Sequence, residues 1–95
     1  MITSKQRAYL RSLANTMPAI LHIGKDGVNQ GVIKQAYDAL QARELIKGQI
    51  LNNSPISARE AITELCEKLG AEPVQQIGNR FVIYRRNDKE PKIEF

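Results

Sequence analysis

Apolar residues recur at two different spacings along the chain, and the changes of spacing divide it into seven segments. In three of them the apolar residues lie three or four positions apart, which is the spacing of a helix with one buried face. The other four are short apolar runs or alternate between apolar and polar residues, which is typical of strands. The predicted order is helix, strand, helix, strand, helix, strand, strand.

The three helices are predicted at about 4–14, 30–43 and 57–69. Two of them begin with a capping box, in which Thr3 stands three residues before Gln6 and Ser57 three residues before Glu60. In each pair the two residues satisfy backbone N–H groups that a helix leaves free at its start. Gly70 follows the last helix and is placed to end it in the left-handed conformation.

The four strands are predicted at about 19–23, 45–51, 73–77 and 80–85. Residues 80–85 are apolar on both faces, so this strand should lie inside the sheet. Gly78 and Asn79 separate it from the preceding strand and give a two-residue hairpin signal. Strands that alternate with helices require crossover connections, so the sheet should be largely parallel, with one antiparallel partner added by the hairpin.

The composition fits one globular α/β domain over residues 1–95, with a core at about 3–86 and a polar tail at 87–95. Hydrophobic residues make up 42% of the chain and charged residues 25%, the balance of a protein that buries a core. No segment has the length or composition of a secretory signal or a membrane span, so we expect a cytoplasmic monomer without membrane contact. The single cysteine excludes an internal disulfide and a cysteine-cluster metal site.

The formal net charge is +4, and the positive charge belongs to the two ends of the chain. Residues 1–47 hold seven cations and three acids, residues 48–77 two and four, and residues 78–95 five and three. If the fold brings the two ends together, one basic face results, and an anionic partner becomes the first expectation. Only five residues are aromatic, so a stacking platform of several rings is not evident.

Gly24, Lys25, Asp26 and Gly27 form a Gly-x-x-Gly loop between a predicted strand and a predicted helix. Glycine permits left-handed backbone and lets a phosphodiester approach the amides, and a helix start adds free N–H groups with partial positive charge. Lys25 would add a charge contact. The alternative is an ordinary turn between strand and helix. The loop lacks the Gly-Lys-Ser/Thr ending of nucleotide-binding loops and does not match the dinucleotide fingerprint.

Further basic residues extend the candidate surface. Arg80, Arg85 and Arg86 flank the last strand, and Lys34 and Lys47 lie on the second helix and second strand. The arginines do not all point the same way, because Arg80 and Arg85 have opposite parity along the strand. The alternative is that these side chains are only solvated.

Nothing in the sequence indicates an active site, so we expect no enzyme activity and no cofactor or metal. His22 is the only histidine, and no recognisable motif ties it to a nucleophile or an acid. Cys66 lies on the apolar face of its helix and is better explained as a small core residue than as a nucleophile.

Four stretches in this order resemble a known family: "SKQRAYLRSLA", "ILHIGKDGVNQGVI", "ELIK" and "QIGNRFVIYR". They are similar to the CRM domain, in particular to its stand-alone bacterial form, the YhbY-like RNA-binding proteins. The resemblance implies a two-layer α/β fold like the C-terminal domain of translation initiation factor three, with a mixed four-stranded sheet in the order 1-2-4-3. It also implies RNA binding through the loop Gly24–Gly27 and association with precursors of the large ribosomal subunit.

The hypothesis is therefore a non-enzymatic RNA-binding protein that acts in ribosome assembly and contacts RNA backbone. Its predicted contact residues are Gly24, Lys25, Asp26, Gly27, Lys34, Lys47, Arg80, Arg85 and Arg86. Two alternatives stay open. One is an adaptor of the translation machinery that binds protein and does not touch RNA. The other is a small enzyme acting on RNA, which would need His22 and an acid near the loop.

Overall fold

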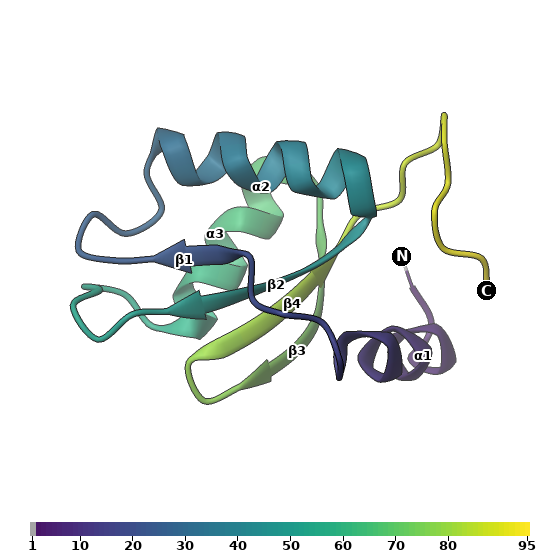
Figure 1. Ribbon diagram of the computed structural model, residues 1–95, viewed down its shortest axis with the longest axis horizontal. Helices are drawn as coiled ribbons and strands as arrows, with labels where there is room; N and C mark the ends of the chain where they lie inside the picture. Colours follow the sequence, from purple (N-terminus) through teal and green to yellow (C-terminus); the bar gives the residue numbers. More distant parts are fainter. Residues whose placement is uncertain (1) are drawn as a thin grey trace.

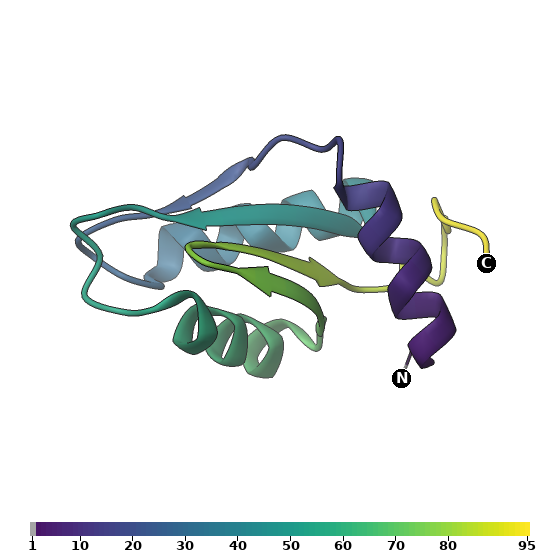
Figure 2. The ribbon, with the colours of Figure 1, turned by 90° about the horizontal axis from the view of Figure 1, so that it is seen from below.

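A computed structural model describes residues 2–95. Its elements are α1 (Ser4–Ala14), β1 (Leu21–Ile23), α2 (Gln30–Arg43), β2 (Leu45–Ile50), α3 (Ala58–Leu69), β3 (Glu72–Ile77) and β4 (Arg80–Tyr84). The strands form one sheet, with α2 and α3 packed on one face (Figure 1). Seen after a quarter turn, α1 and α2 lie on opposite sides of that sheet (Figure 2).

The sheet has the strand order β1-β2-β4-β3. β1 and β2 are parallel, whereas β4 runs antiparallel to both of its neighbours. The helix α2 makes the crossover that parallel pairing requires. The predicted element order, the interior position of residues 80–84 and the mixed sheet with order 1-2-4-3 are confirmed. The expectation of largely parallel pairing is wrong, since only one of the three strand pairs is parallel: β4 lies between β2 and β3 and runs antiparallel to both.

Local sequence signals explain where the helices begin and end. Both capping boxes form, with Thr3 and Gln6 at α1 and Ser57 and Glu60 at α3 bonding each other's backbone reciprocally. Gly70 ends α3 with a φ of 66°, the left-handed conformation that glycine adopts without strain. These predictions from the sequence are confirmed.

The hydrophobic core is divided by the sheet into two parts. The larger part lies between the sheet and the helices α2 and α3, and its largest members include Leu21, Ile23, Leu40, Ile46, Leu65, Phe81 and Ile83. The smaller part lies under α1, where Leu10 and Ala14 pack on Leu45, Val82 and Tyr84. Because α1 is one short helix, this second face of the sheet is covered only in part.

A glycine in β2 makes room for the largest side chain of the main core. Gly48 is the register partner of Phe81, which is only 1% exposed. A Cβ on Gly48 would lie 2.7 and 2.8 Å from two ring carbons of Phe81. The ring therefore occupies the space that any other residue at position 48 would need.

Glu44 is a fully buried carboxylate at the junction of α2 and β2. It accepts hydrogen bonds from the backbone N–H groups of Asn87, Lys92 and Ile93, at 2.6, 2.7 and 2.7 Å. Burial by itself raises the pKa of this carboxyl, but the three donors and the charge of Arg86 outweigh it, so the pKa lies below its ordinary value. Glu44 thereby anchors the segment that follows β4.

Residues 87–95 have no helix or strand, yet they fold back onto the domain (Figure 1). Besides the bonds to Glu44, the ring of Phe95 meets those of Tyr9 and Tyr84 edge to face, each with a centroid distance of 6.0 Å. This polar tail therefore closes over the partly covered end of the sheet beside α1.

Replacing Gly48 with alanine should destabilise the protein by about 1–3 kcal/mol, because the ring of Phe81 must shift to admit a methyl group. Urea unfolding measures the change. Combining Gly48→Ala with Phe81→Leu should cost less than the sum of the two single changes, since the smaller side chain frees the space. Strict additivity of the two free energies would contradict the packing described here.

Replacing Glu44 with glutamine should cost about 1–3 kcal/mol at pH 7, because a neutral amide accepts the three N–H bonds less well. A carboxylate with a lowered pKa stabilises the fold above its unfolded-state pKa, and this contribution is lost as the pH falls through the folded-state value. The difference between wild type and Glu44→Gln should therefore be full at pH 7 and shrink below about pH 4. Urea unfolding across this range tests it, and a difference that does not depend on pH would refute the role of the charge.

Candidate functional site

Two loops meet at the end of the sheet that lies farthest from the chain termini. One connects β1 to α2 and the other connects β2 to α3, and both views show them side by side (Figures 1 and 2). The amide of Leu51 donates to the carbonyl of Ile23 at 2.9 Å, which fixes the two loops to each other at their bases. Parallel pairing of β1 with β2 is the cause, because it brings the carboxyl ends of both strands to the same edge.

Of the two glycines of the Gly-x-x-Gly loop, the backbone conformation requires only Gly27, whereas a Cβ at Gly24 would make ordinary van der Waals contacts. Gly27 has a φ of 61° and donates to the carbonyl of Gly24 at 3.0 Å, which closes a tight turn. A Cβ on Gly24 would lie 3.4 Å from Oδ1 of Asn53 in the neighbouring loop. Between them, Lys25 and Asp26 stand exposed at the tip of the turn. The turn thus accounts for Gly27 and presents the two central residues to solvent.

Free backbone donors gather behind this tip. Asn29 caps α2, and its side chain accepts the amide of Val32 at 2.9 Å. Within the described residues, the amides of Lys25, Asp26 and Gln30 donate no hydrogen bond. A helix start with unpaired amides carries partial positive charge and favours an anion. The turn and the start of α2 therefore offer several donors at one end of the molecule.

The face of the sheet that α1 leaves open is mostly polar, with Ile77 as an exposed apolar residue. In β1, β2 and β4, every second residue packs against α2 and α3. The residues between them therefore point to the open face. One row of register partners crosses all four strands and consists of His22, Gln49, Arg80 and Ile77. His22 directly precedes the last residue of β1, so this row lies beside the Gly-x-x-Gly loop. We call it the open-face row.

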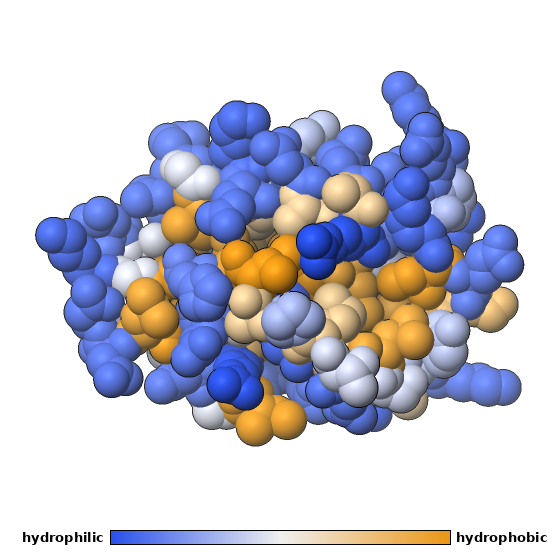
Figure 3. Space-filling view, viewed as in Figure 1, coloured by the Kyte–Doolittle hydropathy of each residue, from blue (hydrophilic) through white to orange (hydrophobic). Residues whose placement is uncertain are grey.

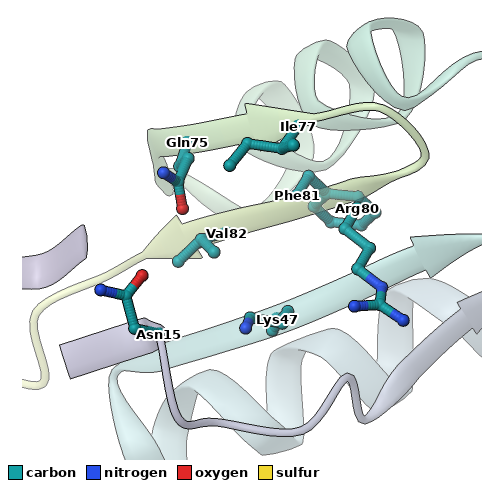
Figure 4. Close-up of a pocket in the computed structure, with 7 residues that line it drawn as sticks. All are labelled: Asn15, Lys47, Gln75, Ile77, Arg80, Phe81 and Val82. Atoms are coloured by element: carbon teal, nitrogen blue, oxygen red, sulfur yellow. The ribbon is translucent and has the colours of Figure 1, made fainter. Parts of the chain in front are cut away.

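A shallow pocket of about 160 Å³ lies next to the open-face row. Lys47 and Arg80 reach it from β2 and β4, Gln75 and Ile77 from β3, and Asn15 from the end of α1. Figure 4 shows these side chains on the same side of the strands, with Val82 between them. No hydrogen bond or ion pair engages the side chain of Lys47 or Arg80 within residues 2–95.

Three of the predicted basic residues lie elsewhere. Lys34 is on the solvent side of α2 and pairs with Asp38 at 3.1 Å. Arg85 and Arg86 follow β4 at the end of the sheet opposite the two loops (Figure 1). Arg86 pairs with Asp88 at 3.1 Å, and both side chains are well exposed. The structure thus brings Lys47 and Arg80 together at the pocket on the open face and does not bring Arg85 and Arg86 there.

Arg85 is held by contacts within the domain. Its guanidinium donates to the carbonyl of Leu69 at 3.1 Å and to Oε1 of Gln41 at 2.8 Å. It also lies 4.8 Å from the ring centroid of Tyr37, a distance at which a cation and a ring attract each other. Arg85 therefore connects α2, α3 and β4, and its donors face the helices and not the open face.

Sequence reasoning missed several polar residues around the two loops and the pocket. They are Asn15, Asn52, Asn53 and Gln75. No motif marks them, because each is brought to its place by the fold. Hydrophilic residues cover most of the molecular outline, including the end where the loops lie (Figure 3). The side chains Glu60, Glu64 and Glu67 make the outer surface of α3 acidic, so the basic surface is confined to other parts of the molecule.

The groups considered for catalysis do not form a reactive site. The side chain of His22 makes no hydrogen bond within the described part of the chain, and the residue is exposed. Burial, and to a smaller extent the charge of Glu72, raises the pKa of the Cys66 thiol to about 11, so it is protonated at neutral pH. Among residues 2–95 no three metal-ligating side chains cluster, and no helix there is long and apolar enough to cross a membrane.

Residues 2–85 match the CRS1 / YhbY (CRM) domain family. The chain is 39% identical over 94 residues to the Bacillus subtilis protein named Probable RNA-binding protein YqeI, covering 99% of this chain and 98% of that one. It is 29% identical over 91 residues to the Pseudomonas aeruginosa protein named Probable RNA-binding protein PA4753, covering 96% and 88%. It is also 29% identical over 93 residues to a Haemophilus influenzae protein named RNA-binding protein, covering 98% and 93%.

The fold is similar to the solution structure of the protein SAV1595 from Staphylococcus aureus. The TM-score is 0.72 and the sequence identity 44%, and the alignment covers 99% of this chain and 98% of that one. The likeness extends over nearly the whole of both chains, which confirms the α/β fold expected from the sequence.

Replacing Arg85 with alanine should lower the free energy of unfolding by about 1–3 kcal/mol, because two hydrogen bonds and the contact with Tyr37 are lost. Arg43→Ala is the matched control, since the exposed side chain of Arg43 makes no hydrogen bond or ion pair within residues 2–95 and such surface changes usually alter stability by about 0.5 kcal/mol or less. Thermal and urea unfolding of both variants measure the difference. Equal stability of the two variants would show that the contacts of Arg85 do not contribute to the free energy of unfolding.

Proposed function

The chain belongs to the CRS1 / YhbY (CRM) domain family, and from this membership we propose that it is an RNA-binding protein with no enzyme activity. Three relatives that cover nearly the whole chain are named as RNA-binding proteins or probable ones. The observation that carries the proposal for this chain is the exposed tip of the Gly-x-x-Gly turn with its unpaired amides, together with Lys47 and Arg80 on the open face, which form no ion pair within residues 2–95.

The turn contacts the sugar-phosphate backbone. Lys25 places a cation at the tip, and the amides of the turn and of the start of α2 supply hydrogen-bond donors. Asp26 offsets the charge of Lys25 locally, so the net attraction for phosphate also depends on Arg80 and Lys47 on the open face. Contacts of this kind recognise the shape and backbone of a folded RNA more than its base sequence.

The partner in the cell is RNA of the large ribosomal subunit during its assembly. This step rests on the resemblance to the YhbY-like proteins. A domain without catalytic groups that holds RNA backbone fits a protein that binds a precursor particle and leaves it unchanged. Sedimentation of cell extracts in sucrose gradients tests the association. Comigration that survives RNase treatment would instead identify a protein-binding adaptor.

Replacing Lys25 with glutamate should weaken binding to a structured ribosomal RNA fragment at every salt concentration without lowering the melting temperature. The logarithm of the binding constant should fall less steeply with the logarithm of salt, by about one unit for one lost phosphate contact. Filter binding at several salt concentrations measures both quantities.

The matched control is Lys89→Glu, which makes the same charge change in the exposed tail at the opposite end of the molecule. It should leave the affinity and the salt dependence close to those of the wild type. If both variants bind equally well, the tip of the turn does not contact RNA. If wild-type binding is insensitive to salt, backbone recognition itself is refuted.

A further inference from the structure

We propose that the pocket on the open face of the sheet holds the base of one unpaired nucleotide next to the structured RNA bound by the Gly-x-x-Gly turn. This inference rests on the proposed RNA binding and adds a second, separate contact to it. The structure supports it through the shape of the pocket, the chemistry of its lining and its position relative to the loop end.

The pocket is of a size that one base could fill, with the sugar and phosphate outside it. Its volume of about 160 Å³ is smaller than the roughly 300–1,000 Å³ that drug-sized ligands and cofactors occupy. Asn15, at the end of α1, lies on one side of the pocket, and Gln75 and Ile77 of β3 lie on the other. A concave site between two walls admits a base that is turned out from a strand, whereas paired bases in a helix stay inside their stack.

The cations at this pocket lack a partner inside the protein. Lys47 is half-buried in the lining, and neither it nor Arg80 pairs with an acid among the described residues. Within residues 2–95 only Lys34, Arg86 and Lys92 lie within 3.3 Å of a carboxylate, so what distinguishes Lys47 and Arg80 is that both line the same hollow. Two unpaired cations beside one hollow make it complementary to the phosphate of a nucleotide.

The remaining lining provides contacts for a base. Gln75 and Asn15 carry amide groups that both donate and accept hydrogen bonds, as the edge of a base requires. The exposed side chain of Ile77 supplies apolar surface above the buried Val82, and the guanidinium plane of Arg80 can lie against a ring. No large aromatic platform is needed for a single base.

The pocket is continuous with the proposed backbone contact. Arg80 belongs both to the pocket and to the open-face row, and the row reaches His22, two residues before Gly24. An RNA that places a phosphate at the turn can therefore extend along this row without crossing an acidic surface. The acidic side chains of α3 lie on the other side of the sheet.

Three RNA probes test the inference with the full chain. The first is a blunt hairpin, the second is the same hairpin with a short unpaired overhang, and the third replaces the bases of that overhang with abasic sites. The wild type should bind the second probe at least about fivefold more tightly than the first. This is the gain in affinity expected when one base stacks on the protein and forms hydrogen bonds with it. The third probe should lose most of this gain, because it keeps the phosphates and lacks the bases.

The double variant Asn15→Ala/Gln75→Ala should also lose the gain from the overhang while binding the blunt hairpin as the wild type does. Thr16→Ala is the control, an exposed neighbour that does not line the pocket, and it should keep the gain. Melting temperatures verify that all variants are folded.

The outcomes separate this inference from the proposed function. If the hairpin binds but the overhang adds nothing, or if the gain survives in the abasic probe or in the double variant, the pocket does not hold a base and the inference is overturned. RNA binding by the turn then still stands. If neither the hairpin nor the overhang binds, the proposed function fails and the inference falls with it.

Discussion

The register of β2 between β1 and β4 is the constraint on which both surfaces of the molecule depend. It turns Ile46 and Ile50 toward α2 and α3, together with Gly48, whose missing side chain makes room for the ring of Phe81. The same register turns Lys47 and Gln49 to the open face. A slip of one residue would exchange the two sets, burying a lysine under the helices and exposing the core. The fit between Gly48 and Phe81 accepts only one alignment of these strands, so it also fixes which polar residues face solvent.

The buried carboxylate of Glu44 plays a corresponding role at the other end of the sheet. Its φ of 64° is a conformation that glycine adopts more easily, and a buried charge is costly unless it is hydrogen-bonded. Three amides of the segment 87–95 supply those bonds. The hydrogen bonds that stabilise the buried charge therefore also fix in place a segment that has no regular secondary structure. Arg85, one residue after β4, holds α2 and α3 in place from the other side. The end of the sheet near the chain termini is thus covered, and the end with the two loops is left accessible.

Most of the fold followed from local signals, because capping boxes, apolar spacing and the two-residue turn each act within a few residues. The spacing also indicated that Arg80 and Arg85 point to opposite faces. What it did not show is which long-range partner each arginine meets. The pocket could not be predicted from the sequence for a similar reason. A bulge between Pro73 and Gln75 shifts the register of β3, and only after that shift do Gln75 and Ile77 share a face with Val82 and Arg80. An irregularity of one residue leaves no periodic signal in a strand of six. The role of Glu44 depends on amides more than forty residues away, which no local pattern contains.

The unequal covering of the two sheet faces suggests why the molecule has a usable polar surface at all. A four-stranded sheet with helices on both faces would need both faces apolar, but α1 spans only 11 residues and packs on Leu45, Val82 and Tyr84 near the closed end. The uncovered part must then carry polar side chains, since an exposed apolar sheet face would promote aggregation. Histidine, glutamine, arginine and lysine satisfy that demand, and they also supply cations and hydrogen-bond donors where no acid competes for them. Because α1 covers only part of this face, the rest of it is polar, and the same polar residues make it suitable for binding a polyanion. Acidic residues would have met the first demand equally well, so the choice of basic ones is the part that the proposed function explains.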